Sequence, residues 1–340
     1  MKERQSNIEL LRIIAMFLVL LVHADFYSLG VVTPQDIRAF SLDSVLKVFF
    51  EAISINCVDI FVLISGWFGI RASFKGGCKF LFQCFFFLSL IYVITLLLGI
   101  SKVNAETIKY LFVATKWNWF IKAYLLLYII SPVLNAFVDH ASKRQFAIVL
   151  LSFYAFQFFY GWIFTSATGY IVGGYSVSSF IGLYLLARYI NVYDCQFKSL
   201  SVLRGWFICL AICCMVTVLY ITPSLFNVDV TFMGGHFLSY ISPTTIACSL
   251  LMLVTFSKIH IQSRFINFVA KSSFAVFLIH TNPNILSYYQ DLFVMLHAHL
   301  STGFFWIVAF AAMVCIFLIG IILDQLRIQL WKKVSTFYDK

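Results

Sequence analysis

The chain alternates between long apolar runs and short polar connections. Ten apolar runs are bounded by charged, polar, glycine or proline residues, and a membrane-spanning helix needs about 20 such apolar residues. The runs cover residues 8–29, 44–68, 80–100, 118–138, 146–164, 175–190, 205–222, 238–256, 268–288 and 303–326. We therefore predict an all-α, polytopic integral membrane protein with about ten transmembrane helices, folded as one transmembrane domain over residues 1–340.

The composition agrees with a bilayer environment. Hydrophobic residues make up 62% of the 340 residues and charged residues 11%, with a mean hydropathy of +0.94. Soluble globular domains have about a quarter of their residues charged, and disordered chains are poor in apolar residues. A water-soluble enzyme and a disordered chain are therefore excluded. The nine cysteines lie mostly inside apolar runs without a Cys-x-x-Cys pair, which predicts free, buried thiols.

The basic residues predict how the helices cross the membrane. An even number of spans puts both termini on one side, and the connections on that side contain eighteen of the 24 Lys and Arg residues. Because cytoplasmic loops carry the excess of basic residues, both termini are predicted to be cytoplasmic. The net charge of +10 is spread over these short clusters, so no nucleic-acid partner is expected. Lys2 and Arg4 also fit a signal peptide, but Glu9 and Arg12 favour a retained helix.

A few ionisable residues lie inside the predicted helices. A charged side chain at membrane depth costs free energy unless it faces the protein interior, a partner or water. Arg12 and His23 are eleven residues apart, which places them on one helix face, about 16 Å apart along the axis. Arginine suits phosphate recognition and histidine transfers protons near neutral pH, so this face could hold an elongated ligand. Alternatively, Arg12 only reaches the headgroups and His23 lies at the opposite interface. The other such residues are Glu9, Asp25, Glu51, Asp59, Lys122 and His280.

Four segments along the chain form recognisable motifs. They are Asn7 to Arg12 (NIELLR) with His23 after ten intervening residues, Val58 to Gly66 (VDIFVLISG), Trp119-Phe120 through Pro132, and Ser273 to His280 (SFAVFLIH). The spacing of arginine and histidine in the first helix and the Phe-x-x-x-Ser-Gly pattern in the second are specific as a pair. Together these motifs resemble those of the acyltransferase 3 family of integral membrane acyltransferases.

The resemblance implies transfer of an acyl group, most often acetyl from acetyl-CoA, to a hydroxyl of a cell-surface polysaccharide or lipid-linked glycan. It implies a multi-pass protein of the bacterial inner membrane whose partners are the acyl-CoA donor, a glycan or glycolipid acceptor and membrane lipids. Acetyl-CoA is then a co-substrate, and no bound cofactor is expected.

The resemblance also implies roles for individual residues. Arg12 would bind the phosphates of the donor, and His23 would be the catalytic residue, either as general base or through a transient acyl-histidine. Arg71 and Lys75 are further candidates for donor binding. Many family members carry an arginine-rich segment with a proline there, and lysine does not reproduce a bidentate arginine contact.

Several residues could line the site, and each also has a plainer structural interpretation. Small residues favour close helix packing, and aromatic residues at a helix end fit an aromatic belt. We expect Asp59 or a residue of another helix to orient His23, because Asp25 projects to a different face. Asn282 and Pro283 predict a local break in the helix. The candidates are Glu9, Asp59, Ser65, Gly66, Trp119, Lys122, Tyr124, His280 and Asn282.

A metal site is not expected. His297 and His299, with Asp291 nearby, offer ligands that zinc accepts, but no third ligand has a suitable spacing. We interpret these histidines as residues of an outer loop.

The main alternative function is a transporter or a flippase of lipid-linked oligosaccharide, because hydropathy alone would permit it. A transporter predicts internal repeats and paired broken helices, and neither is apparent in the sequence. A glycan polymerase would be expected to carry a long, arginine-rich outer loop, whereas a non-catalytic membrane sensor is compatible with the composition.

Overall fold

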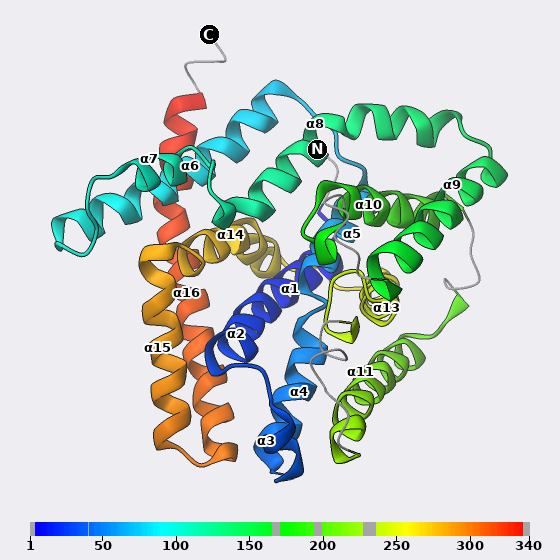
Figure 1. Ribbon diagram of the computed structural model, residues 1–340. Coiled ribbons are helices and arrows are strands. Elements are labelled where there is room, and N and C mark those ends of the chain that lie inside the picture. The colour runs from blue at the N-terminus through cyan, green and yellow to red at the C-terminus, as the bar shows by residue number, and fades with distance from the viewer. Residues whose placement is uncertain (1–3, 40, 165–170, 194–198, 227–235, 336–340) are drawn as a thin grey trace.

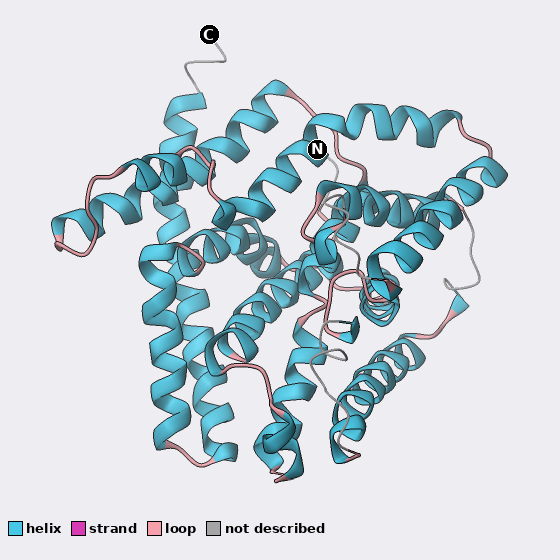
Figure 2. Ribbon diagram, viewed as in Figure 1, coloured by secondary structure: helices cyan, strands magenta, loops and turns pink. Residues whose placement is uncertain are grey.

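The computed structural model describes residues 4–39, 41–164, 171–193, 199–226 and 236–335. Within these residues the regular structure is entirely helical, without strands (Figure 2), so the all-α prediction is confirmed. The α-helices are α1 (Ser6–Ala24), α2 (Phe26–Leu29), α3 (Pro34–Arg38), α4 (Leu42–Ser54), α5 (Cys57–Phe68), α6 (Phe74–Leu97), α7 (Ala105–Leu111), α8 (Trp119–His140), α9 (Lys143–Phe156), α10 (Val177–Val192), α11 (Val202–Leu225), α13 (Pro243–Ser257), α14 (Arg264–His280), α15 (Pro283–His299) and α16 (Thr302–Ser335). Shorter helices of other types are η1 (Lys116–Asn118), η2 (Gln157–Ile163) and η3 (Val172–Gly174).

Seven helical stretches of the described residues are long and apolar enough to cross a membrane. Two further helices, α10 and α13, are apolar but shorter. Helices form at each of the ten predicted runs, whereas ten crossings and cytoplasmic termini remain predictions. The seven stretches are Ser6–Leu29, Leu42–Phe68, Phe74–Leu97, Ala105–His140, Lys143–Ile163, Val202–Pro223 and Thr302–Ser335.

Helix α1 lies at the centre of the bundle (Figure 1). It packs against α4, α5, α13, α14 and α16, and apolar residues of several of its faces are buried. Its polar first turn is held by neighbouring helices, because the Ser6 hydroxyl donates to Asn267 Oδ1 at 3.0 Å and the Asn7 amide donates to the Phe256 carbonyl at 2.9 Å. A helix surrounded in this way presents its side chains to protein on all sides.

The first two apolar runs are each broken within the bundle. Helix α1 ends at Ala24, because Asp25 has a non-helical ψ of −110°, and the chain resumes as α2. Helix α4 ends at Ser54, where the amide of Asn56 donates to the carbonyls of Ala52 and Ile53 at 3.0 and 2.9 Å. Irregular backbone at membrane depth is tolerated where it is buried in protein or lines a cavity. Neither break was expected from the sequence.

The predicted helix over residues 268–288 is not continuous. Helix α14 ends at His280, and Asn282 caps α15 by accepting a hydrogen bond from the backbone of Asn284 at 3.0 Å. Pro283 occupies the first position of α15, where a missing N–H costs nothing. The predicted break at Asn282 and Pro283 is therefore confirmed.

The interpretation of residues 297 and 299 as part of an outer loop is wrong. Both histidines lie in the last turn of α15, and His297 Nε2 lies 3.1 Å from the carboxylate of Asp43 in α4. Helix α15 packs alongside α16 (Figure 1). The polar residues of α15 interrupt the apolar pattern from which the helices are predicted, so the sequence does not reveal this helix.

Candidate active site

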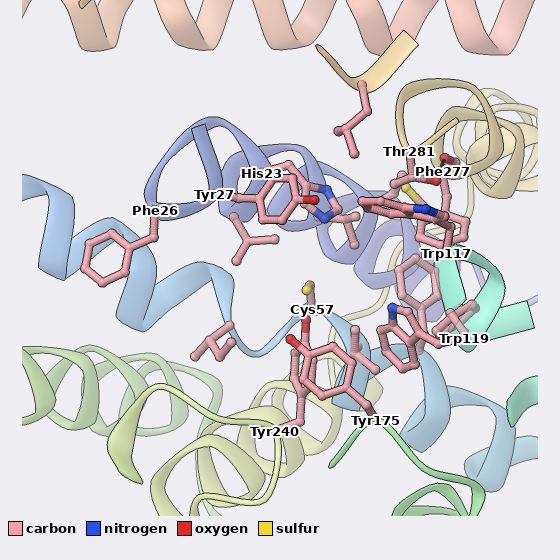
Figure 3. A pocket seen from close by; sticks show the side chains of 18 of the residues that line it. His23, Phe26, Tyr27, Cys57, Trp117, Trp119, Tyr175, Tyr240, Phe277 and Thr281 are labelled. Carbon is pink, nitrogen blue, oxygen red and sulfur yellow. Dashed lines mark hydrogen bonds between the residues drawn. The ribbon is translucent and has the colours of Figure 1, made fainter. Parts of the chain in front are cut away.

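A cavity of about 570 Å³ lies beside the break between α1 and α2. Its walls come from α1, α2, the junction of α4 and α5, the start of α8, α14 and the segment before α13 (Figure 3). Most of the lining is aliphatic or aromatic, and few polar groups interrupt it. This combination is typical of a small-molecule site, in which a few polar groups fix the orientation of a ligand. Apart from tyrosine, tryptophan and cysteine, the polar lining residues are His23, Glu51, Lys116 and Thr281.

His23 lies on the cavity wall and is hydrogen-bonded to a second histidine. His23 Nδ1 is 3.0 Å from His280 Nε2, and His280 Nδ1 is 2.7 Å from the carbonyl oxygen of Val276. A carbonyl only accepts, so His280 Nδ1 carries a proton, and the Nε2 of a neutral His280 is an acceptor. His23 must then donate from Nδ1, which leaves its Nε2 unprotonated. The hydrogen-bond network thus assigns to His23 the tautomer that a general base needs.

His280 is fixed by its surroundings. Its side chain is 1% exposed, and its ring packs against that of Tyr289 with centroids 5.5 Å apart. The Tyr289 hydroxyl donates to the Leu20 carbonyl at 2.6 Å, which ties α15 to α1. Because His280 cannot turn freely, its lone pair is held toward His23.

The carboxyl groups near His23 do not orient it. Asp25 is fully buried, and neither of its carboxyl oxygens has a hydrogen-bond partner among the described residues. Asp59 is buried in the same way and does not line the cavity. Asp59 or a residue of another helix was expected to orient His23. In the structure the residue hydrogen-bonded to His23 is His280, which belongs to another helix.

The candidates for donor binding lie outside the cavity. Arg12 Nη1 is 3.3 Å from Glu9, and the same carboxylate lies 3.5 Å from Arg4. Arg71 and Lys75 are exposed, before and within the first turn of α6. The structure therefore does not place any of these residues on the wall next to His23.

The remaining candidates are dispersed. Trp119 lines the cavity, whereas Lys122 is exposed and Asn282 caps α15. The hydroxyls of Ser65 and Tyr124 lie 3.1 Å apart, outside the cavity lining.

Gly66 serves helix packing. A Cβ at this position would lie 2.4 Å from the backbone oxygen of Tyr184 in α10. The missing side chain therefore allows α5 and α10 to approach closely.

Sequence reasoning did not select several residues of the cavity wall. Glu51 was noted as an ionisable residue inside a helix, which was a usable signal, but its neighbourhood was unknown. The aromatic residues gave no signal, because the chain is rich in such residues throughout. The lining residues not selected include Tyr27, Glu51, Cys57, Trp117, Tyr175 and Tyr240.

Comparison with known families decides what kind of protein carries this site. A family model of the acyltransferase domain, that of acyltransferase 3, matches residues 5–324. The chain belongs to the acyltransferase 3 family. The match covers α1 through most of α16, so His23, His280 and the cavity all lie within the acyltransferase domain. No curated protein and no solved structure matches the chain.

The family and the apolar helices together establish a membrane acyltransferase. No finding supports the transporter or flippase alternative. In this acyltransferase the imidazole of His23 borders a cavity large enough for a small organic group.

Proposed function

We propose that this acyltransferase is an O-acetyltransferase of the bacterial inner membrane. It transfers acetyl from cytoplasmic acetyl-CoA to a hydroxyl of a cell-surface polysaccharide or of its lipid-linked precursor. The observation that carries the proposal is the His23–His280 pair beside the cavity, because its hydrogen bonds leave His23 Nε2 free to take a proton.

The proposed reaction proceeds by general base catalysis at His23. The acceptor hydroxyl gives its proton to His23 Nε2 while its oxygen attacks the thioester carbonyl. The new C–O bond forms, the C–S bond breaks, and the proton passes from His23 to the leaving thiolate, which gives an ester and free CoA. His280 accepts the Nδ1–H hydrogen bond throughout and keeps the imidazole in place.

The proposed topology supplies the two substrates from opposite sides. Ten crossings with cytoplasmic termini would put Arg12 near the cytoplasm, about 16 Å along α1 from His23. In that topology, Tyr27 and Trp117, which are 45% and 46% exposed at the rim of the cavity, belong to outward-facing connections. The acceptor then enters from outside, and Arg12 binds the donor phosphates inside.

The proposal is tested with purified protein in lipid nanodiscs. The assay measures transfer of labelled acetyl from acetyl-CoA to a lipid-linked glycan fraction extracted from host membranes. His23→Ala should abolish transfer, because it removes the imidazole that takes the hydroxyl proton. His299→Ala is the matched control, since this exposed histidine in α15 bonds only its own helix at the Met295 carbonyl and should retain full transfer.

Full transfer by His23→Ala would contradict the proposal. The same samples, rapidly denatured at neutral pH before acceptor is added, separate the two mechanisms. General base catalysis leaves the wild-type chain unlabelled, whereas an acyl-histidine would label the wild type and not His23→Ala.

A further inference from the structure

Glu51 is a buried carboxyl residue on the wall of the same cavity. It lies in the last turn of α4 and is 5% exposed. Its carboxyl group interacts with the backbone N–H of Phe26, the first residue of α2, whereas Oε2 has no hydrogen-bond partner among the described residues. Oε2 therefore remains available to a ligand.

An unpartnered carboxyl oxygen at this depth needs an explanation. More than about nine in ten buried polar groups in proteins have a hydrogen-bond partner, and the exceptions gather at functional sites. Asp25 lies close enough to Glu51 for their carboxyl groups to interact electrostatically, so the region is rich in acceptors. A ligand that fits against Oε2 of Glu51 must bring a hydrogen-bond donor.

The rest of the wall indicates the shape of that ligand. The ring centroids of Trp119 and Tyr175 are 4.6 Å apart, and those of Tyr175 and Tyr240 are 5.0 Å apart. These rings and that of Tyr27 line the cavity (Figure 3), and Glu51 belongs to the same lining. Flat aromatic surfaces with one fixed acceptor suit a ring that has apolar faces and hydroxyl groups at its edge.

We propose that Glu51 holds the acceptor, by accepting a hydrogen bond at Oε2 from a sugar hydroxyl other than the one that reacts at His23. This inference rests on the proposed function for its identification of the acceptor as a glycan. It adds a positioning residue and a substrate class: the polyhydroxylated ring of the acceptor occupies the cavity.

The inference is tested by binding, without catalysis. The probes are the methyl glycosides of glucose, galactose, mannose and N-acetylglucosamine, titrated calorimetrically into wild-type nanodiscs free of sugar detergents. Glu51→Gln keeps an oxygen for the Phe26 N–H but replaces the free acceptor with a donor. It should therefore raise the Kd of the tightest glycoside about tenfold or more.

Monodeoxy analogues of that glycoside identify the hydroxyl. One analogue should bind the wild type about tenfold more weakly than its parent, and Glu51→Gln should lose that difference, because the two changes remove one interaction. Tyr154→Phe is the matched control, since it removes another buried, unpartnered oxygen, on α9 away from the cavity, and should leave Kd unchanged.

Three results would overturn the inference. The first is that every glycoside binds the wild type with a Kd above about 100 mM, which corresponds to a binding free energy of under about 2 kcal/mol. The second is that all deoxy analogues bind like the parent glycoside, and the third is that Glu51→Gln binds with wild-type affinity. The last would show that Glu51 only caps α2. The deoxy series on the wild type keeps the inference falsifiable if the variant does not fold. Acetyl transfer is scored separately, so glycoside binding without transfer would count against the proposed function alone.

Discussion

In His23, the imidazole Nδ1 donates a hydrogen bond to His280, and Nε2 carries no proton. The chain of hydrogen bonds from His23 to His280 to the Val276 carbonyl can be satisfied in only one direction when both rings are neutral. The second histidine therefore acts through the first. It takes the place that a carboxylate takes in many catalytic triads, without adding a negative charge to an apolar site.

Replacing His280 should lower the turnover of acetyl transfer. In His280→Ala, His23 Nδ1 loses its acceptor and the other tautomer becomes populated, so we expect kcat to fall about 100-fold with little change in the KM for acetyl-CoA. His280→Gln offers an amide oxygen to the same proton and should recover part of the loss. The measurement is steady-state transfer by each purified variant. Wild-type kcat in His280→Ala, or equal losses in both variants, would show that His280 only packs.

Individual residues differ in how far the sequence could predict them. Arg12 and His23 share one helix, so helical geometry alone gave their common face and separation. The contact between His23 and His280 joins residues 257 positions apart, so neither the position of His280 inside a predicted helix nor the family resemblance predicted it. The aromatic wall could not be predicted, because 19% of the chain is aromatic and the selection among these residues is made by tertiary packing.

At the scale of elements, three broken helices meet at the cavity. The junctions of α1 with α2, α4 with α5 and α14 with α15 each contribute lining residues, among them Tyr27, Cys57 and Thr281. The third break was predictable because proline marks it. The breaks at Asp25 and Asn56 carry no proline or glycine, and their freed carbonyls are satisfied by side chains such as Asn56 itself. Local sequence therefore does not reveal them.

Close packing of α5 on α10 should depend on Gly66. An added Cβ would lie 2.4 Å from the Tyr184 backbone oxygen, which cannot rotate away, so Gly66→Ala should destabilise the fold by about 1–3 kcal/mol. The measurement is the midpoint of thermal unfolding in detergent. Gly303→Ala is the control, because a Cβ there has open space and alanine favours helix. A Gly66→Ala midpoint equal to that of Gly303→Ala would contradict the packing role.

At the scale of the whole molecule, the charged residues divide into two groups. Most lie in short connections, where eighteen of 24 basic residues predict the cytoplasmic side. Those buried in the described part of the bundle include three groups: Glu9 pairs with Arg12, Asp324 pairs with Arg327 within α16, and Asp25 lies beside Glu51 next to the cavity. Of these three groups, the last adjoins the candidate site.

The central claim is that His23 promotes transfer of an acetyl group from a donor inside to an acceptor outside. Sealed membrane vesicles containing the acyltransferase and its host glycolipids test it directly, with membrane-impermeant labelled acetyl-CoA added outside and alkali-labile label in the glycan fraction as the readout. Inside-out vesicles expose the cytoplasmic face, so they should transfer label, whereas right-side-out vesicles and both kinds carrying His23→Ala should not. Transfer by right-side-out vesicles alone, or undiminished transfer with His23→Ala, would contradict the account.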